Sequence, residues 1–264
     1  TVLNQENSIL WQDLVKISSS PGGKRPKAIV ALNKGTGEVI SGQGIIPEGF
    51  QHYILKYDDN SAYPYAKLEY VYYRMALDAG IEMMPSELRT YDGVTHFLTQ
   101  RFDREGNEKI HTQTLAAMLP TSDSYEDIFS VIRRLNLPYE DSRQHFLRMV
   151  FNVTTRNVDD HSKNFSFCMN KKGIWRLSPA YDLTYSVDLT APAYSNRHSL
   201  TINGKNEDIT REDLGTVGQN NDIQDYNALI DTVYNAVAKF ESHARELRID
   251  EKLIKSIQED FIKV

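Results

Sequence analysis

An Asp and an Asn, five positions apart, lie past the middle of the chain and are followed at a distance by a second Asp. Asp159 and Asn164 come directly after a helical pattern, in the stretch Val-Asp-Asp-His-Ser-Lys-Asn-Phe of residues 158–165. Behind them two short apolar runs surround a turn, and the second run leads to Asp182. A hairpin of this kind returns Asp182 to the Asp159 loop. Two carboxylates and an amide then supply the proton acceptor and the hard oxygen ligands for Mg²⁺ that a phosphoryl-transfer site needs.

Length and composition fit one large domain or one two-lobed unit. The chain has 264 residues, a net charge of −6, 40% hydrophobic residues and 25% charged residues. No stretch approaches the ~18 consecutive apolar residues of a membrane helix, so we expect no membrane association. The single Cys168 excludes an internal disulfide framework and a thiolate zinc site, and it favours a reducing, cytoplasmic compartment. The mild acidity argues against a protein that coats DNA.

A small-residue, cationic loop precedes the first predicted strand. Residues 18–27 have the sequence Ser-Ser-Ser-Pro-Gly-Gly-Lys-Arg-Pro-Lys and lead into an apolar run at 28–32. Gly22 and Gly23 let backbone N–H groups come close to an anion, and Lys24 adds charge, so the loop is a candidate phosphate cradle. A flexible surface loop is the alternative. The loop is not a Walker A motif, because the Gly-Lys-Ser/Thr ending is missing.

A second predicted strand ends in a lysine, which indicates a functional role only if a carboxylate pairs with it. This strand, 52–56, ends at Lys56, and a helix with a core-facing apolar stripe follows at 64–80. A lysine at a strand end is usually solvated, unless a carboxylate in the next helix meets it. Glu69 is the candidate partner, although a solvated helix Glu is the more common case. A further strand leads into the hinge that we expect between two lobes, at 100–105.

The second half of the chain is mostly helical in pattern. Predicted helices lie at 113–119 (capped by Thr112), 125–135, 141–156, 226–240 and 253–264. Residues 188–225 are rich in Asn, Thr, Asp and Gly, so we expect loops there, with one short strand at 199–202. Together the elements predict an α+β, bilobal, protein-kinase-like fold. Its small β-rich N-lobe spans 1–103 and its larger, mostly helical C-lobe spans 104–264.

Five stretches carry a resemblance to a known family. They are SSSPGGKRPKA (18–28), YILKY (53–57), QRFDR (100–104), VDDHSKNFSF (158–167) and SPAYDLTYS (178–186). In these stretches the chain resembles the HipA-like serine/threonine kinases, toxins of bacterial toxin–antitoxin systems. The Asp-x-His-x-Lys-Asn stretch with the later Pro-x-Tyr-Asp is specific to this family. The His-Arg-Asp and Asp-Phe-Gly motifs of ordinary protein kinases do not occur.

The resemblance implies a role for each matching residue. Asp159 would be the catalytic base or would position the substrate hydroxyl, and Lys163 would contact the γ-phosphate. Asn164 and Asp182 would hold Mg²⁺. For ATP, Lys56 would contact the α- and β-phosphates, and the backbone from Gln100 to Phe102 would receive the adenine. Gly22, Gly23 and Lys24 would contact ATP from the cationic loop. His161 would also lie at the ATP site, although its main role would be to hold its own loop.

The resemblance also implies regulation by self-phosphorylation. In the family a serine of the cationic loop is phosphorylated by the kinase itself, which ejects the loop and shuts the enzyme off. Ser20 falls on the matching position, and Ser18 falls on a second site used in short members. A phosphoserine adds roughly −1.5 to −2 charge and would compete with the ATP phosphates in the cradle. The alternative is that three serines simply make a soluble turn.

The resemblance names partners as well. Full-length members carry a subdomain before the serine loop that contacts the antitoxin, whereas residues 1–17 alone precede the loop here. We therefore expect the short, HipT-like form, in which that subdomain is a separate protein, or a truncated chain. The implied partners are a protein substrate such as an aminoacyl-tRNA synthetase and an antitoxin with a helix-turn-helix, with DNA reached only through the antitoxin.

Two alternatives from other functional classes stay open. One is a catalytically silent scaffold that binds an antitoxin on DNA as a corepressor. The intact set of Lys56, Asp159, Asn164 and Asp182 argues against it. The other is a small-molecule phosphotransferase of the aminoglycoside or choline type, whose active site also uses an Asp, an Asn and a second Asp in this order. The serine loop argues against that function.

Overall fold

The computed structural model of the chain describes residues 27–58, 63–91, 93–188, 192 and 196–263. It divides into two compact units, Thr1–Tyr70 with Met84–Ile110, and Val71–Met83 with His111–Val264. The chain thus passes from one unit to the other within helix α2 (Tyr65–Asp78) and again after residues 83 and 110. The sequence placed the boundary between lobes at 103 and the hinge at 100–105.

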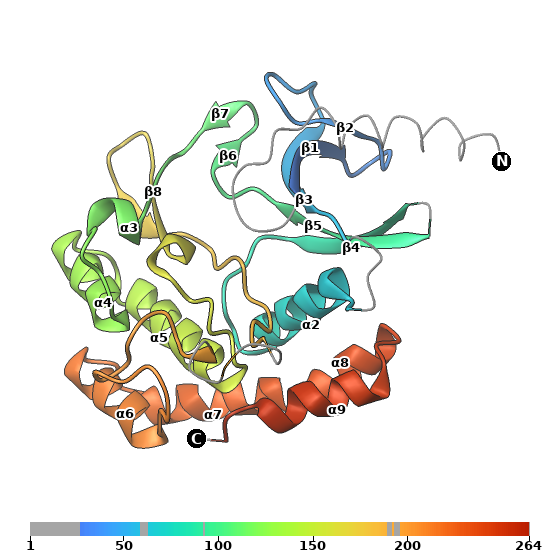
Figure 1. Cartoon of the computed structure of the whole chain (residues 1–264). Coiled ribbons are helices and arrows are strands. Elements are labelled where there is room, and N and C mark those ends of the chain that lie inside the picture. Colours follow the sequence, from blue (N-terminus) through green and yellow to red (C-terminus); the bar gives the residue numbers. More distant parts are fainter. Residues whose placement is uncertain (1–26, 59–62, 92, 189–191, 193–195, 264) are drawn as a thin grey trace. The chain divides into compact units, whose positions relative to one another are not determined.

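The first unit is built around an antiparallel five-stranded sheet in the order β2-β1-β3-β5-β4 (Figure 1). Its strands are β1 (Lys27–Asn33), β2 (Val39–Ser41), β3 (Phe50–Lys56), β4 (Ser86–Tyr91) and β5 (Val94–Gln100). A two-stranded ribbon of β6 (Arg104–Glu105) and β7 (Glu108–Lys109) follows. The sequence missed β4, a polar edge strand without the alternating burial of an inner strand.

The core of this sheet is formed by one face of the apolar strand β1. Ala28, Val30 and Leu32 share one face of the strand, as the period of two requires, and all three are fully buried. Ala28 lies opposite Leu55 of β3, which in turn lies opposite Leu98 of β5. One apolar row therefore crosses three strands and fixes their register.

Helix α2 (Tyr65–Asp78) confirms the helix predicted at 64–80. Its start after a proline agrees with the preference for proline at helix beginnings. Tyr72, which belongs to the second unit, packs edge-on against Phe151 and Phe240. Its hydroxyl donates to the Thr155 carbonyl at 2.6 Å. The C-terminal half of α2 is therefore tied into the helical core of the second unit.

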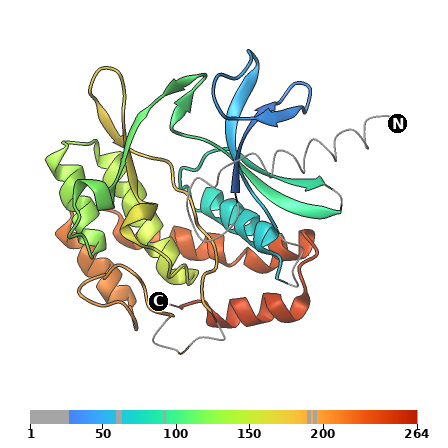
Figure 2. The ribbon, with the colours of Figure 1, turned by 45° about the horizontal axis from the view of Figure 1, so that its top comes forward.

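The second unit combines helices with a small sheet. The helices are α3 (Leu115–Met118), α4 (Tyr125–Arg134), α5 (Tyr139–Thr154), α6 (Arg211–Asn220), α7 (Tyr226–Val237), α8 (Phe240–Glu246) and α9 (Glu251–Asp260). The antiparallel sheet has the order β10-β9-β8 and consists of β8 (His111–Thr114), β9 (Ser166–Met169) and β10 (Trp175–Leu177). The almost wholly buried α5 packs against α4 and α7 (Figures 1 and 2).

Three expectations for this unit are wrong. Residues 188–225 are not only loops, because they contain α6. The helix expected at 113–119 begins later, since residues 111–114 pair with β9 and Thr114, rather than Thr112, caps the helix. The single helix expected at 226–240 is interrupted after Val237, where α7 ends and the chain turns into α8.

Close contact between α6 and α7 depends on a glycine. A Cβ added at Gly218 would lie 2.7 Å from the Cβ of Tyr226 and 3.1 Å from the Phe146 ring. Carbon atoms without a bond between them do not approach that closely in a well-packed interior. Gly218 therefore allows α6 to approach both α7 and the central α5.

One strand-rich unit and one mostly helical unit confirm the predicted α+β class. Among the described helices, none combines the length and the apolar character that crossing a membrane demands.

Candidate active site

The loop after α5 places two adjacent aspartates in opposite environments. The side chain of Asp159 is 71% exposed, whereas that of Asp160 is 0% exposed. Asp160 accepts hydrogen bonds from the Tyr125 hydroxyl, from His198 Nδ1 and from the Ser199 N–H, each at 2.7 Å. Three donors satisfy this buried carboxylate, so its role is to hold the loop. Asp159 is the carboxylate that a substrate can reach.

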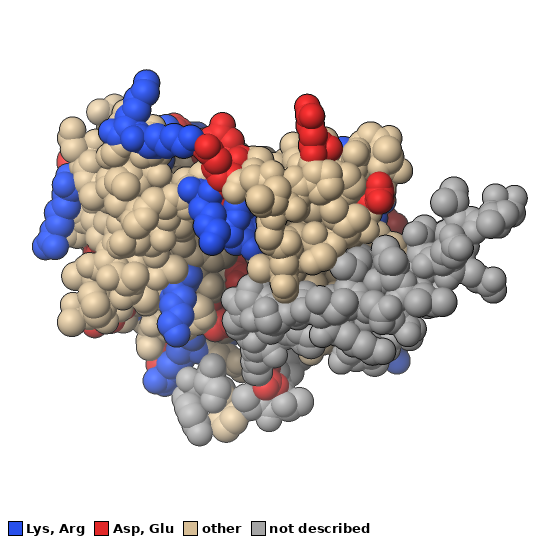
Figure 3. All heavy atoms as spheres, turned by 90° about the horizontal axis from the view of Figure 1, so that it is seen from above, with Lys and Arg blue, Asp and Glu red and all other residues tan. Residues whose placement is uncertain are grey.

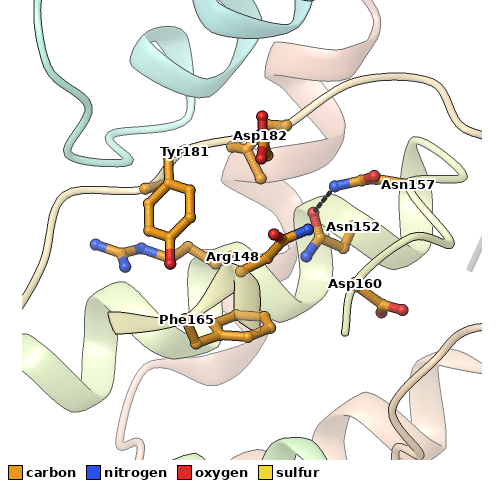
Figure 4. A pocket seen from close by; sticks show the side chains of 10 residues that line it. Arg148, Asn152, Asn157, Asp160, Phe165, Tyr181 and Asp182 are labelled. Carbon is orange, nitrogen blue, oxygen red and sulfur yellow. Dashed lines mark hydrogen bonds between the residues drawn. The ribbon is translucent and has the colours of Figure 1, made fainter. Parts of the chain in front are cut away.

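A chain of buried polar groups supports the backbone beneath Asp159. Asn152 of α5 donates to the Tyr125 hydroxyl oxygen, and Asn157 donates to Asn152 Oδ1, both at 2.9 Å (Figure 4). The Ser186 hydroxyl donates to Asn157 Oδ1 at 3.3 Å. The same hydroxyl oxygen accepts the N–H groups of residues 158–159 at 2.7 and 3.0 Å. The loop is thus anchored to α4, α5 and the segment after β10.

Asn164 ends a short 3₁₀ turn, η1 (Ser162–Asn164), and folds back on the loop. Its Nδ2 donates to the Asp159 carbonyl at 2.8 Å. Because the amide nitrogen is committed to the backbone, the amide oxygen remains as the ligand atom. Lys163, one residue earlier, is exposed. The His161 Nε2 lies 3.8 Å from Asp159 Oδ1, which is beyond a hydrogen bond but within the range of an ion pair.

Asp182 and the tyrosine before it occupy a constrained segment. Asp182 has a φ of +56°, in the left-handed region that few residues other than glycine adopt. The Tyr181 hydroxyl donates to the Lys163 carbonyl at 2.8 Å and accepts from Ser166 Oγ at 2.6 Å. Burial raises the pKa of Tyr181 to about 12, so its hydroxyl keeps the proton that it donates at neutral pH.

A pocket of the second unit is lined by both Asn164 and Asp182. Figure 4 shows this pocket with Asp182 labelled. Its wall also includes Arg148, Asn152, Asn157, Asp160, Phe165, Ala180, Tyr181 and Leu183. A carboxylate and an amide oxygen are ligands that Mg²⁺ accepts, while it retains several waters. In the described part of the chain, no three His, Cys, Asp or Glu side chains gather into a metal-binding group. The site therefore fits Mg²⁺ better than a metal that needs a full protein cage.

Arg148 is a pocket residue that the sequence did not reveal. It is 3% exposed, and its Nε has no hydrogen-bond partner among the described residues. Burial lowers its pKa to about 10, partly offset by the negative charges of Glu82 and Asp141. A polar residue four positions before Asn152 on a buried helix was the available signal, because both face the same side. Arg148 places a positive charge beside the Tyr181 ring at the wall of the pocket (Figure 4).

The first unit contains the predicted lysine–glutamate pair. Lys56 Nζ, at the end of β3, lies 2.5 Å from Glu69 Oε1 in α2. The two side chains are only 17% and 10% exposed. Lys56 Nζ also lies 5.9 Å from the centre of the Phe97 ring. These contacts hold the lysine ammonium in one place, as a phosphate-binding role requires.

The backbone predicted to receive an adenine is partly committed to the sheet. The Gln100 N–H donates to the Pro85 carbonyl at 3.0 Å, and the Arg101 N–H donates to the His52 carbonyl at 2.9 Å. A contact between the base and this segment would therefore not use the N–H groups of Gln100 and Arg101. The predicted cradle (Gly22, Gly23, Lys24) and the predicted phosphorylation sites (Ser18, Ser20) lie outside the described residues.

Comparison with known proteins decides the family. The HipA-like C-terminal domain family matches residues 19–261. The chain belongs to this family. Y4mE of Sinorhizobium fredii, which is named as a kinase, is 28% identical over 130 residues, 43% of this chain and 31% of that protein.

A solved structure shows the same fold. HipA of Shewanella oneidensis MR-1, in its complex with HipB and operator DNA, matches with a TM-score of 0.67 and 16% identity, over 92% of this chain and 63% of that one. The Helicobacter pylori proinflammatory kinase CtkA gives a TM-score of 0.49 and 11% identity, over 79% of this chain and 90% of that one. The HipA match confirms the predicted kinase-like fold. The chain spans less than two thirds of the length of either Y4mE or this HipA.

Proposed function

We propose that the chain is an ATP- and Mg²⁺-dependent serine/threonine protein kinase and the toxin of a bacterial toxin–antitoxin system. The observation that carries the proposal is the contrast between an exposed Asp159 and a fully satisfied Asp160, next to a pocket lined by Asn164 and Asp182. Membership of the HipA-like family supports it.

The proposed chemistry depends on positioning and charge more than on a strong base. Asp159 accepts the hydrogen bond of the acceptor hydroxyl and orients its oxygen toward the phosphate. Mg²⁺, held by Asn164 and Asp182 when bound, neutralises charge on the ATP phosphates. Lys163 is exposed beside Asn164 and contacts the γ-phosphate. Lys56, held by Glu69, binds the α- and β-phosphates.

The acceptors that we propose are proteins. One is the chain itself, at Ser20 or Ser18, which would regulate the kinase. The other is an aminoacyl-tRNA synthetase, whose modification would arrest translation. Both substrates are met in the cytoplasm, where we place the activity.

We further propose an antitoxin partner that carries a helix-turn-helix, with DNA bound only through it. The HipA of Shewanella oneidensis was solved together with HipB and operator DNA, which supports such an assembly. Figure 3 shows Lys and Arg side chains in several separate groups on the face viewed there, some beside Asp and Glu. The net charge of −6 favours indirect rather than direct contact with DNA.

Transfer of labelled phosphate from ATP tests the proposed function. We expect the wild-type chain to label serine in the presence of Mg²⁺ and to stop when the metal is chelated. Asp159→Asn should lower the rate by about 10²-fold or more. The matched control is Asp231→Asn, which changes an exposed aspartate on α7 and should leave the rate unchanged. A wild-type chain that binds ATP but labels no protein would favour the catalytically silent scaffold instead.

A further inference from the structure

Two hydroxyl groups, those of Tyr181 and Ser186, join the loop of residues 157–164 to the segment of residues 181–186 in the second unit at two points. The first point is Tyr181. A hydroxyl carries one proton, so Ser166 donates to the Tyr181 oxygen at 2.6 Å and Tyr181 donates to the Lys163 carbonyl at 2.8 Å. Lys163 directly precedes Asn164, and Tyr181 directly precedes Asp182. One hydrogen bond therefore joins the residues before the two proposed metal ligands.

The ligand positions depend on this bond because both backbones are locally constrained. Asn164 is held by its own amide on the Asp159 carbonyl, and its N–H donates to the His161 carbonyl at 2.8 Å. Asp182 sits at a φ of +56° directly after Tyr181. A bond between these two short segments leaves little freedom in the distance between the ligand side chains.

The second point is Ser186. Its Oγ accepts the Val158 N–H at 2.7 Å and the Asp159 N–H at 3.0 Å, while its own proton goes to Asn157. Two consecutive N–H groups thus end on one oxygen that belongs to another segment. The Asp159 side chain is exposed, so its backbone is what holds it in place.

We propose that Tyr181 and Ser186 are positioning residues with separate tasks: Tyr181 sets the distance between the metal ligands Asn164 and Asp182, and Ser186 fixes the backbone of Asp159. This inference rests on the proposed function, since it assigns tasks within the same site. Each task depends on a single hydroxyl group, so each is tested by a substitution that removes one oxygen atom.

The Tyr181 task is tested by metal binding without turnover. Mg²⁺ is titrated calorimetrically into the chain saturated with a non-hydrolysable ATP analogue. Tyr181→Phe keeps the ring in the pocket wall and removes only the hydroxyl, and it should raise the Kd for Mg²⁺ about tenfold. The control Tyr139→Phe, which removes an exposed hydroxyl bound to Asp225, should leave it unchanged. An unchanged Kd in Tyr181→Phe, or no Mg²⁺ binding by the wild type, overturns this assignment.

The Ser186 task is tested by amide hydrogen exchange. In Ser186→Ala the amides of residues 158 and 159 should exchange about fivefold faster, because each loses its acceptor. Ser186→Thr, which keeps a hydroxyl, should restore slow exchange. The control Ser242→Ala, which removes an exposed hydroxyl on α8, should not change it. Exchange at the wild-type rate in Ser186→Ala overturns the assignment.

The two variants should also differ in the proposed reaction. Ser186→Ala should lower kcat about tenfold at unchanged Mg²⁺ affinity, since misplacement of the reacting group lowers kcat. Tyr181→Phe should recover most of its rate at high Mg²⁺. Identical metal dependence in both variants contradicts the division of tasks. Calorimetry and exchange need no phosphate transfer, so a chain without kinase activity refutes the proposed function while these two readouts still decide the inference.

Discussion

Substitution of Asp160 by Asn removes one charge from a fully buried group and should destabilise the fold. The carboxylate accepts from Tyr125, His198 and Ser199, all at 2.7 Å. The amide oxygen of Asn can still accept one or two of these bonds, but its NH₂ must face a donor. A buried donor that loses its acceptor costs about 1–3 kcal/mol. We therefore expect the free energy of unfolding to fall by about 1–3 kcal/mol, a sizeable share of the about 5–15 kcal/mol typical of a folded domain.

Urea unfolding measures this effect, with Asp159→Asn as the matched neighbour. In Asp160→Asn the midpoint should move to lower urea at an unchanged slope, which indicates lost stability rather than a changed unfolded state. Asp159 is exposed, so Asp159→Asn should alter stability by less than about 0.5 kcal/mol while it lowers phosphate transfer by about 10²-fold or more. The reasoning is refuted if Asp160→Asn unfolds at the wild-type midpoint, or if Asp159→Asn is the less stable variant.

Three further changes test other parts of the structure. Glu69→Gln should lower phosphate transfer at least about tenfold, because Lys56 loses the carboxylate that positions it, and it should cost about 1–3 kcal/mol in stability, because the ion pair is largely buried. Kinetics on the folded variant and urea unfolding check this, and an unchanged rate contradicts it. Burial lowers the pKa of His145 to about 3, so below about pH 6.5 the unfolded chain binds more protons than the folded chain. Stability therefore falls as the pH drops, by up to about 1.4 kcal/mol per pH unit from this residue. In His145→Gln the urea midpoint should decline less steeply with falling pH, and an equal decline in both proteins refutes this. Gly218→Ala should cost about 1–3 kcal/mol in urea unfolding, since the new Cβ would lie 2.7 Å from Tyr226, and a wild-type midpoint shows that α6 can shift at no cost.

Local patterns in the sequence were enough to predict most elements. The apolar run at 28–32 predicts a strand, and β1 (Lys27–Asn33) contains that run. The spacing of Asp159 and Asn164 acts within one short turn, where the Asn164 amide reaches the Asp159 carbonyl at 2.8 Å. The Lys56–Glu69 pair joins a strand end to the next helix, so it depends on few intervening residues.

Elements with little apolar content escaped prediction. α6 has Leu214 and Val217 as its larger apolar residues and contains two glycines, so its helical period is weak. Its capping box of Thr210 and Asp213 was a usable start signal, with the acidic residue three positions after the threonine. β4 is polar and lies at the edge of the sheet, where alternation is not required.

Features that depend on distant contacts could not be predicted from local sequence. Asp160 is buried because His198 and Ser199, almost forty positions later, fold over it. Similarly, the roles of the Tyr181 and Ser186 hydroxyl groups depend on hydrogen bonds to a loop 18 to 28 positions earlier in the chain. Spacing within one segment carries no information on such pairs, because tertiary packing brings them together.

The intact mass of the purified chain after incubation with ATP and Mg²⁺ tests the central claim most directly. We predict that the wild-type chain gains one or more phosphates that map to Ser18 or Ser20, and that Asp159→Asn gains none. A wild-type chain without added mass, or an Asp159→Asn variant that gains phosphate at the wild-type rate, would contradict the claim that this chain is a self-phosphorylating serine kinase with Asp159 at its active site.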